Sequence, residues 1–115
     1  MRAFLCYRWG ITIVDHTLNQ IKRLIIRGNY PFTLKAESEL EVDGLLIEDA
    51  LEAIINAESV YKVINSSNPR TGKKEKLYII KGNTYDNITI YTKGKISQLG
   101  GKLRFYILIS SKRSL

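Results

Sequence analysis

The spacing of hydrophobic residues along the chain changes near residue 59. Before this point apolar residues recur every three or four positions, as in amphipathic helices, and after it they alternate with polar residues, as in half-buried strands. The first pattern predicts three short helices, over residues 18–27, 34–41 and 47–57. The second predicts four strands, over residues 59–65, 75–81, 87–93 and 102–112. Helices followed by strands indicate an α+β fold, with three helices packed on one face of a four-stranded, mainly antiparallel sheet.

Capping and turn-forming residues set the predicted boundaries of these elements. Thr17 and Thr33 are suitable N-caps for the first two helices, and Gly28 is a suitable C′ residue for the first. Glu48 and Asp49 lie in the first turn of the third helix, where acids interact favourably with the helix dipole. Three connections contain glycine and favour an antiparallel meander, namely those over residues 66–74, 82–86 and 94–101.

The length of 115 residues predicts a single domain over residues 1–115. Residues 1–14 begin like a weak signal peptide, but Arg8 interrupts the apolar part and no small-residue cleavage site follows. We treat this segment as an N-terminal leader whose place in the natural chain the sequence leaves open. No apolar run approaches the roughly 20 residues of a membrane span, and Cys6, the only cysteine, cannot form an internal disulfide. We therefore expect a soluble, cytoplasmic protein.

Charge is distributed unevenly between the two halves of the chain. Residues 1–60 hold 6 basic and 9 acidic residues, a net charge of −3, whereas residues 61–115 hold 12 basic and 2 acidic residues, a net charge of +10. A basic half of this kind predicts a polyanionic partner, because cations that neutralise phosphates release counterions from nucleic acid. The alternative is an ordinary basic surface that keeps a small protein in solution.

Strand alternation predicts which side chains share a face. In the last strand, Leu103, Phe105, Ile107 and Ile109 form an apolar row that we expect to meet the helices. The opposite, open surface is then expected to combine tyrosines with cations, from Tyr78, Tyr91, Lys93, Arg104, Tyr106 and Lys112. Tyrosine among Lys and Arg suits both base stacking and phosphate pairing, although Tyr and Lys are also common on a solvated sheet face.

Other kinds of site lack support in the sequence. One His, one Cys and no acid cluster on the basic strands give no metal constellation, and we expect neither a metal nor a small-molecule cofactor. Ser110 and Ser111 have no His or acid at a recognisable spacing, which disfavours serine nucleophilic chemistry. Gly94, Gly100 and Gly101 are predicted turn glycines, and no phosphate-binding glycine loop is present.

Several short motifs resemble the MqsR family of bacterial mRNA interferase toxins, which have a RelE-like α/β fold. The similarity covers roughly residues 16–112, and the stretch 32–45 also resembles a neighbouring group of small bacterial toxin-like domains. The motifs that carry it are His16-Thr17, Gln20-Ile21-Lys22-Arg23-Leu24, Gly28, Asp43-Gly44, Tyr61-Lys62, Ile90-Tyr91-Thr92-Lys93 and Ile109-Ser110-Ser111-Lys112.

This resemblance implies metal-independent cleavage of RNA by lysines, a glutamine and a tyrosine. The family's lysines correspond to Lys62 and Lys112 and its tyrosine to Tyr91, while the glutamine position falls near Tyr78, a departure from the family. The remaining predicted contacts to RNA come from Lys73, Lys74, Lys93, Lys95, Arg104 and Tyr106. The resemblance also implies a cognate antitoxin, of a type that binds zinc, as a protein partner.

These expectations combine into two hypotheses. In the first, the protein is the toxin of a toxin–antitoxin pair and cleaves single-stranded mRNA by attack of a ribose 2′-OH on the adjacent phosphate, with Tyr91 or a lysine as acid or base. In the second, the basic sheet binds RNA or a partner protein without cutting.

Overall fold

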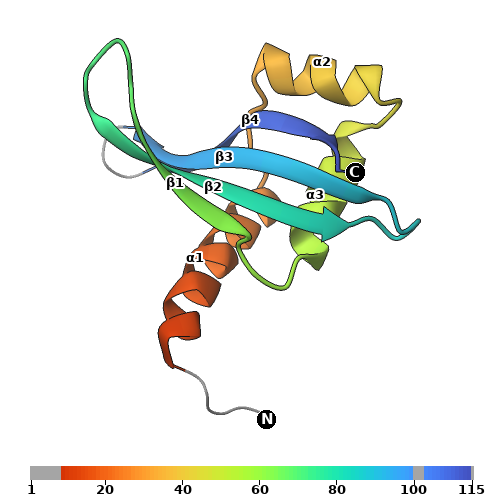
Figure 1. The fold of residues 1–115 in the computed structure, drawn as a ribbon, viewed down its shortest axis with the longest axis horizontal. Helices are drawn as coiled ribbons and strands as arrows, with labels where there is room; N and C mark the ends of the chain where they lie inside the picture. The colour runs from red at the N-terminus through yellow and green to blue at the C-terminus, as the bar shows by residue number, and fades with distance from the viewer. Residues whose placement is uncertain (1–8, 100–102, 115) are drawn as a thin grey trace.

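Three helices precede a four-stranded antiparallel sheet in the computed structural model, which describes residues 9–99 and 103–114 (Figure 1). The strands follow one another in space in the order β1-β2-β3-β4, so the predicted α+β fold and antiparallel meander are confirmed. The elements are α1 (Trp9–Ile26), α2 (Leu34–Val42), α3 (Ile47–Asn56), β1 (Lys62–Ser67), β2 (Lys74–Asn83), β3 (Thr89–Leu99) and β4 (Leu103–Arg113). None of the described helices is long and apolar enough to span a bilayer.

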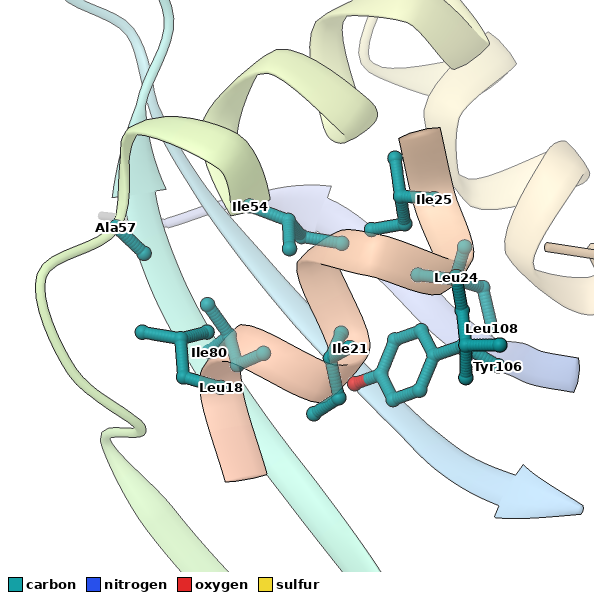
Figure 2. Close-up of a cluster of buried hydrophobic side chains, with 9 residues drawn as sticks. All are labelled: Leu18, Ile21, Leu24, Ile25, Ile54, Ala57, Ile80, Tyr106 and Leu108. Atoms are coloured by element: carbon teal, nitrogen blue, oxygen red, sulfur yellow. The ribbon is translucent and has the colours of Figure 1, made fainter. Parts of the chain in front are cut away.

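Two clusters of buried hydrophobic side chains attach the helices to the sheet. The larger joins α1 and α3 to β2 and β4 through Leu18, Ile21, Leu24, Ile25, Ile54, Ala57, Ile80, Tyr106 and Leu108 (Figure 2). The smaller joins α2 and α3 to β3 through Leu40, Leu45, Ala50, Ala53 and Ile90. Burial of each large apolar side chain contributes about 1.5–3 kcal/mol, so these clusters fix the helices in place. We call the side of the sheet against α1 and α3 the helix face and the opposite side the open face.

The helix boundaries agree with the sequence at most positions, but not at the start of α1. This helix begins at Trp9, so Thr17 lies within it and the N-cap prediction for Thr17 is wrong. Residues 9–14 of the predicted leader therefore belong to α1, and residues 1–8, including Cys6, lie outside the described residues. Gly28 follows the helix at φ +84°, as a C′ glycine should. Thr33 caps α2 as predicted, because its Oγ1 accepts a hydrogen bond of 3.1 Å from the Ala36 amide.

The third strand is longer than predicted and contains an irregularity. β3 continues to Leu99, so Gly94 lies within a strand and the prediction that it forms a turn is wrong. Lys93 pairs with Ser110, but Gly94 pairs with Leu108, which leaves Ile109 as an extra residue in β4. Such a bulge reverses the alternation of the strand that carries it.

The bulge reverses the predicted faces of β4. Tyr106 and Leu108 are fully buried on the helix face, whereas Phe105 and Ile107 project to the open face and are only partly buried. A similar correction applies to β2, where Tyr78 and Ile80 face the helices instead of Leu77 and Ile79. In β2 alternation groups the residues correctly and only the choice of the buried face is wrong, whereas in β4 the bulge breaks the alternation between Leu108 and Ser110.

The segment before α2 and α2 itself cover the outer edge of β4. The amides of Tyr106 and Leu108 donate to the carbonyls of Asn29 and Pro31, each at 2.9 Å. Farther along the strand, Glu39 and Asp43 of α2 accept hydrogen bonds from the amides of Ser111 and Arg113. These contacts satisfy edge groups that would otherwise be free to pair with another strand, and they place α2 beside the end of β4 that carries Lys112.

Candidate functional site

The open face carries a row of three polar residues across β2, β3 and β4. Tyr91 on β3 pairs directly with Lys81 on β2 and with Lys112 on β4. Directly opposed residues have Cβ atoms about 4.5–5.5 Å apart, so the two amines flank the tyrosine. The Nζ of Lys112 lies 5.5 Å from the centroid of the Tyr91 ring, a distance at which the cation is attracted to the ring.

A second row runs beside the first and crosses all four strands. It consists of Lys62, Ile79, Lys93 and Ser110, in the order of the strands. Ile79 is only 6% exposed although it lies on the open face, which is expected where long lysine stems cover an apolar neighbour. Together the two rows place four lysines around Tyr91, and we call Lys62, Lys81, Tyr91, Lys93 and Lys112 the lysine–tyrosine patch.

Acidic side chains border the patch at two places, α2 beside β4 and Glu58 in the hollow next to Lys81. Ser110, at the β4 end of the second row, donates a hydrogen bond of 2.7 Å from its Oγ to Glu39 of α2. Lys112 lines a surface hollow with Glu39 and Asp43 of the same helix. None of the seven residues that form the two rows is acidic. Positive charge is therefore concentrated within the two rows, and the neighbouring carboxylates lie at their borders.

A second tyrosine, Tyr61, extends the patch beyond the start of β1. The Nζ of Lys81 lies 4.1 Å from the centroid of the Tyr61 ring, and the Tyr61 side chain is 62% exposed. Both residues line a hollow of about 390 Å³, which also includes residues 56–59, 82 and 83. An exposed aromatic ring next to a cation offers a surface on which a nucleobase can stack while its phosphate pairs with the amine.

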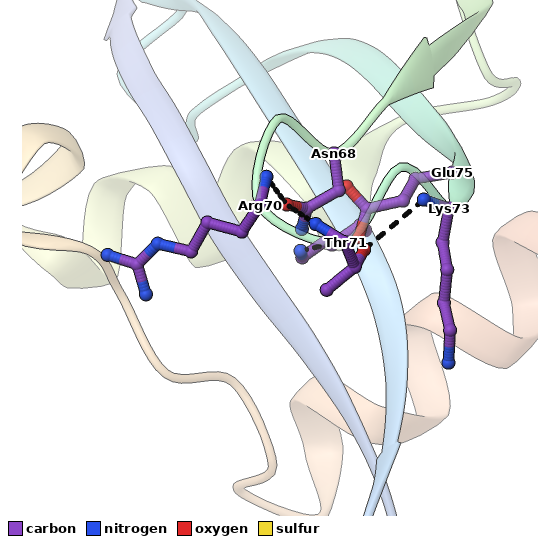
Figure 3. Close-up of polar contacts among 6 residues, drawn as sticks. Asn68, Arg70, Thr71, Lys73 and Glu75 are labelled. Carbon is purple, nitrogen blue, oxygen red and sulfur yellow. Dashed lines mark hydrogen bonds and ion pairs between the residues drawn. The ribbon is translucent and has the colours of Figure 1, made fainter.

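Two lysines predicted to contact RNA, Lys73 and Lys74, lie at the hairpin between β1 and β2. Asn68 organises this loop, because its Oδ1 accepts hydrogen bonds from the amides of Arg70 and Thr71 (Figure 3). Lys73 and Lys74 are exposed, with Lys74 at the start of β2, so the structure does not bring them into the two rows.

Lys95 lies on the open face but has a carboxylate partner. Its Nζ is 2.8 Å from Oε2 of Glu75, and the two side chains are 25% and 28% exposed. The hydrogen bond from Lys95 lowers the pKa of the Glu75 carboxyl below its ordinary value, against a smaller opposing effect of desolvation. A phosphate would have to compete with Glu75 for this lysine, in contrast to the lysines of the patch.

Three predicted site residues lie on the helix face, away from the patch. Tyr106 is fully buried, so its prediction as an RNA contact is wrong. Tyr78 packs against the larger core cluster, and its prediction as a neighbour of Tyr91 on the open face is wrong. Arg104 is exposed, but it lies beside α1, where it lines a different hollow. All three were placed on the open face because we expected the other face of β2 and of β4 to meet the helices.

Lys81 and Tyr61 are the members of this surface that the sequence did not reveal. Lys81 lies on the same face of β2 as Leu77 and Ile79, whose hydrophobicity suggests a buried row and not an open surface. Tyr61 precedes β1 by one residue. The lysines themselves are the signal that could have identified this surface. A lysine such as Lys81 in an apparently apolar row favours the exposed face, and Tyr61 is next to Lys62 in the chain.

Neither a metal site nor a comparison with known proteins indicates the function of this surface. Among the described residues, no group of three or more His, Cys, Asp or Glu side chains lies close enough to hold a metal ion. No protein-family model, curated protein or solved structure matches the chain.

Proposed function

We propose that the open face binds single-stranded RNA and that the lysine–tyrosine patch cleaves it as an endoribonuclease. The observation that carries this proposal is the row in which Lys81 and Lys112 flank Tyr91, with the Lys112 amine 5.5 Å from the ring centroid. Amines pair with the phosphates of the backbone, while the exposed ring of Tyr61 beside Lys81 suits stacking of an unpaired base.

In the proposed reaction, the 2′ oxygen of a ribose attacks the adjacent phosphorus as its proton leaves. The new O2′–P bond forms, the P–O5′ bond breaks, and the departing 5′ oxygen gains a proton. The products are a 2′,3′-cyclic phosphate and a 5′-hydroxyl. Tyr91 is the group of the patch that is not an amine, and we assign it to proton transfer, a contribution of about 10²–10⁴ in rate. Lys62, Lys93 and Lys112 stabilise the negative charge that develops on the phosphate oxygens.

The resemblance to the MqsR toxins extends this proposal to a cellular role. Three of the residues it aligns, Lys62, Tyr91 and Lys112, belong to the patch, whereas Tyr78 does not. A toxin that cleaves mRNA in the cytoplasm, neutralised by an antitoxin that covers the open face, is consistent with that arrangement. An adjacent reading frame that encodes a small zinc-binding protein would support this extension.

A second candidate function is RNA binding without cleavage. It is favoured by the position of Tyr78 on the helix face, which leaves a single tyrosine to transfer protons within the patch. The two functions share the same surface and differ only in whether Tyr91 acts on the bound phosphate.

The experiment that separates them is incubation of the purified protein with a single-stranded RNA in EDTA, with both cleavage and binding measured. We expect fragments ending in a cyclic phosphate, and near-complete loss of cleavage in Tyr91→Phe and Lys112→Ala. Tyr85→Phe and Lys76→Ala are matched controls, because Tyr85 is 79% exposed in the loop before β3 and Lys76 lies on the opposite side of β2. RNA that is retarded but intact would favour the binding function. Fragments that persist in both patch variants would contradict the assignment of Tyr91 and Lys112.

A further inference from the structure

A second concentration of positive charge lies on the helix side of the sheet, between the C-terminal half of α1 and the strands β3 and β4. A hollow of about 140 Å³ is lined there by Gln20, Arg23, Leu24, Arg27, Ile96 and Arg104. Three arginines therefore line one small space: Arg23 in the last turn of α1, Arg27 just after the helix and Arg104 on β4. We call these six residues the arginine hollow.

The three arginines lack compensation by acidic groups. None of the six lining residues is Asp or Glu, and among the described residues no carboxylate forms an ion pair with Arg23, Arg27 or Arg104. The like charges repel one another, although exposure of the three side chains screens part of this repulsion. An anion in the hollow would remove this repulsion.

The helix dipole explains part of this arrangement but not all of it. Arg23 lies in the last turn of α1 and Arg27 directly follows the helix, where cations interact favourably with the carbonyl end. Arg104 belongs to β4, and it points to the same hollow because the bulge at Ile109 sets Arg104, Tyr106 and Leu108 on the helix face. The helix dipole therefore does not account for the position of Arg104 beside two other arginines.

The chemistry of the hollow selects the class of anion. Guanidinium groups bind phosphate with two parallel hydrogen bonds, and Gln20 adds an amide donor at the rim. Leu24 is 6% exposed and supplies an apolar floor, while the three arginines remain exposed to solvent and accessible to a ligand. A phosphomonoester carries a charge of about −1.5 to −2 at pH 7, whereas a diester within an RNA backbone carries only −1. The positive charge of three arginines therefore complements the dianionic monoester better than the singly charged diester.

We infer that the arginine hollow is a binding site for a phosphomonoester dianion, separate from the lysine–tyrosine patch on the open face. A nucleoside 5′-monophosphate and the 5′-phosphate of an RNA strand present this group, and inorganic phosphate presents the same dianionic phosphate without the ester. The inference does not depend on RNA cleavage, because its residues lie on the other face of the sheet.

The test is titration calorimetry of the full chain at constant ionic strength with three probes: inorganic phosphate, adenosine 5′-monophosphate, and a short RNA with a 5′-phosphate compared with its 5′-hydroxyl form. We expect saturable binding of the phosphomonoesters, and a loss of affinity of about tenfold or more in Arg104→Gln and in Arg23→Gln, since hydrogen bonds between charged groups are the strong ones. Arg70→Gln, in the exposed loop between β1 and β2, is the matched control and should bind as the unsubstituted protein does. Unfolding midpoints of the variants check that the fold is intact.

The probes also distinguish the source of the ligand. In the Tyr91→Phe background, in which RNA is expected to stay intact, tighter binding of the 5′-phosphorylated RNA than of its 5′-hydroxyl form identifies the end of an RNA strand. Equal binding of the two RNAs, with saturable binding of inorganic phosphate, identifies free phosphate. Affinity for adenosine 5′-monophosphate should fall below about pH 6, where the second proton returns to the monoester, while affinity for sulfate should not. Phosphate binding that is undetectable, or that survives in Arg104→Gln, would overturn the inference. Tyr91→Phe and Lys112→Ala should retain phosphate binding, so failure of the proposed cleavage leaves this test unaffected.

Discussion

The phenol ring of Tyr106 on β4 occupies the space in which a side chain at Gly94 of β3 would lie. A Cβ atom at position 94 would be 2.5 Å from Cζ of Tyr106 and 2.8 Å from the carbonyl oxygen of Ile107. The contact coincides with the register shift between Lys93 and Gly94. A glycine within β3 therefore allows a large aromatic side chain to enter the core beneath the sheet.

This contact predicts that Gly94→Ala destabilises the protein. One of the two obstructing groups is a backbone carbonyl that cannot rotate away, so the strands must separate locally or Tyr106 must leave its position. Overpacking of this kind costs about 1–3 kcal/mol. Chemical denaturation measures the loss, with Gln98→Ala, an exposed position in the same strand, as the control. Equal stability of Gly94→Ala and the unsubstituted protein would show that Tyr106 does not require the glycine.

The sequence predicts the elements of this fold better than it predicts their faces. Local chemistry is sufficient where a side chain acts on its own helix, as Thr33 does when it caps α2. The bulge at Ile109 instead depends on the pairing of β3 with β4, and no local sequence pattern around Ile109 predicts it. A glycine such as Gly94 favours a turn when read alone, whereas here it is required by an aromatic residue twelve positions away.

The residues of the candidate site likewise divide into those that local alternation predicts correctly and those whose positions depend on strand pairing. Tyr91, Lys93 and Lys112 were correctly placed together because they belong to segments on the same side of the bulge, where simple alternation holds. Tyr106 and Arg104 lie on the other side of it and were placed on the wrong face for that reason. Lys62 joins the patch only through the pairing of β1 with β2, a relationship that sequence spacing does not contain.

A second prediction concerns the hydroxyl group of Tyr106. This group is buried and makes no hydrogen bond among the described residues, and a buried polar group without a partner costs about 1–3 kcal/mol. Tyr106→Phe keeps the ring in the core and removes the group, so we expect an increase in the free energy of unfolding of about 1 kcal/mol. Tyr78→Phe, at a partly buried neighbour, is the control. A loss of stability in Tyr106→Phe would indicate that the hydroxyl has a partner.

The same side chain makes stability sensitive to high pH. Burial, with a smaller contribution from Tyr78, raises the pKa of Tyr106 above its ordinary value of 10.0. The unfolded chain then releases this proton at a lower pH than the folded protein, so stability is unaffected below about pH 10 and falls as the pH rises above it. Thermal unfolding at pH 9 and pH 11 should show a larger decrease for the unsubstituted protein than for Tyr106→Phe. Parallel decreases would contradict the assignment.

Glu39 is predicted to fasten α2 to the edge of β4. Its Oε1 accepts hydrogen bonds from Ser110 Oγ at 2.7 Å and from the Ser111 amide at 3.2 Å. Glu39→Ala leaves both donors without this acceptor and should cost about 1–3 kcal/mol, whereas Glu39→Gln keeps an acceptor oxygen and should cost less. Glu37→Ala is the control because Glu37 is exposed on the same helix. Denaturation midpoints rank the three variants, and a Glu37→Ala cost equal to that of Glu39→Ala would refute the role of the contact.

The salt dependence of RNA binding is the most direct measure of how many lysines of the patch meet phosphates. For a single strand, the slope of log K against log salt is about −0.7 for each phosphate neutralised. Contacts from Lys62, Lys81, Lys93 and Lys112 thus predict a slope of roughly −3. Replacement of any one of them by Ala should reduce its magnitude by about 0.7, whereas Lys76→Ala, on the helix side of β2, should leave it unchanged. A slope that responds equally to Lys76→Ala would mean that RNA is attracted by the net charge of the chain and not by this surface. The measurement requires a Tyr91→Phe background, in which the bound RNA is expected to stay intact.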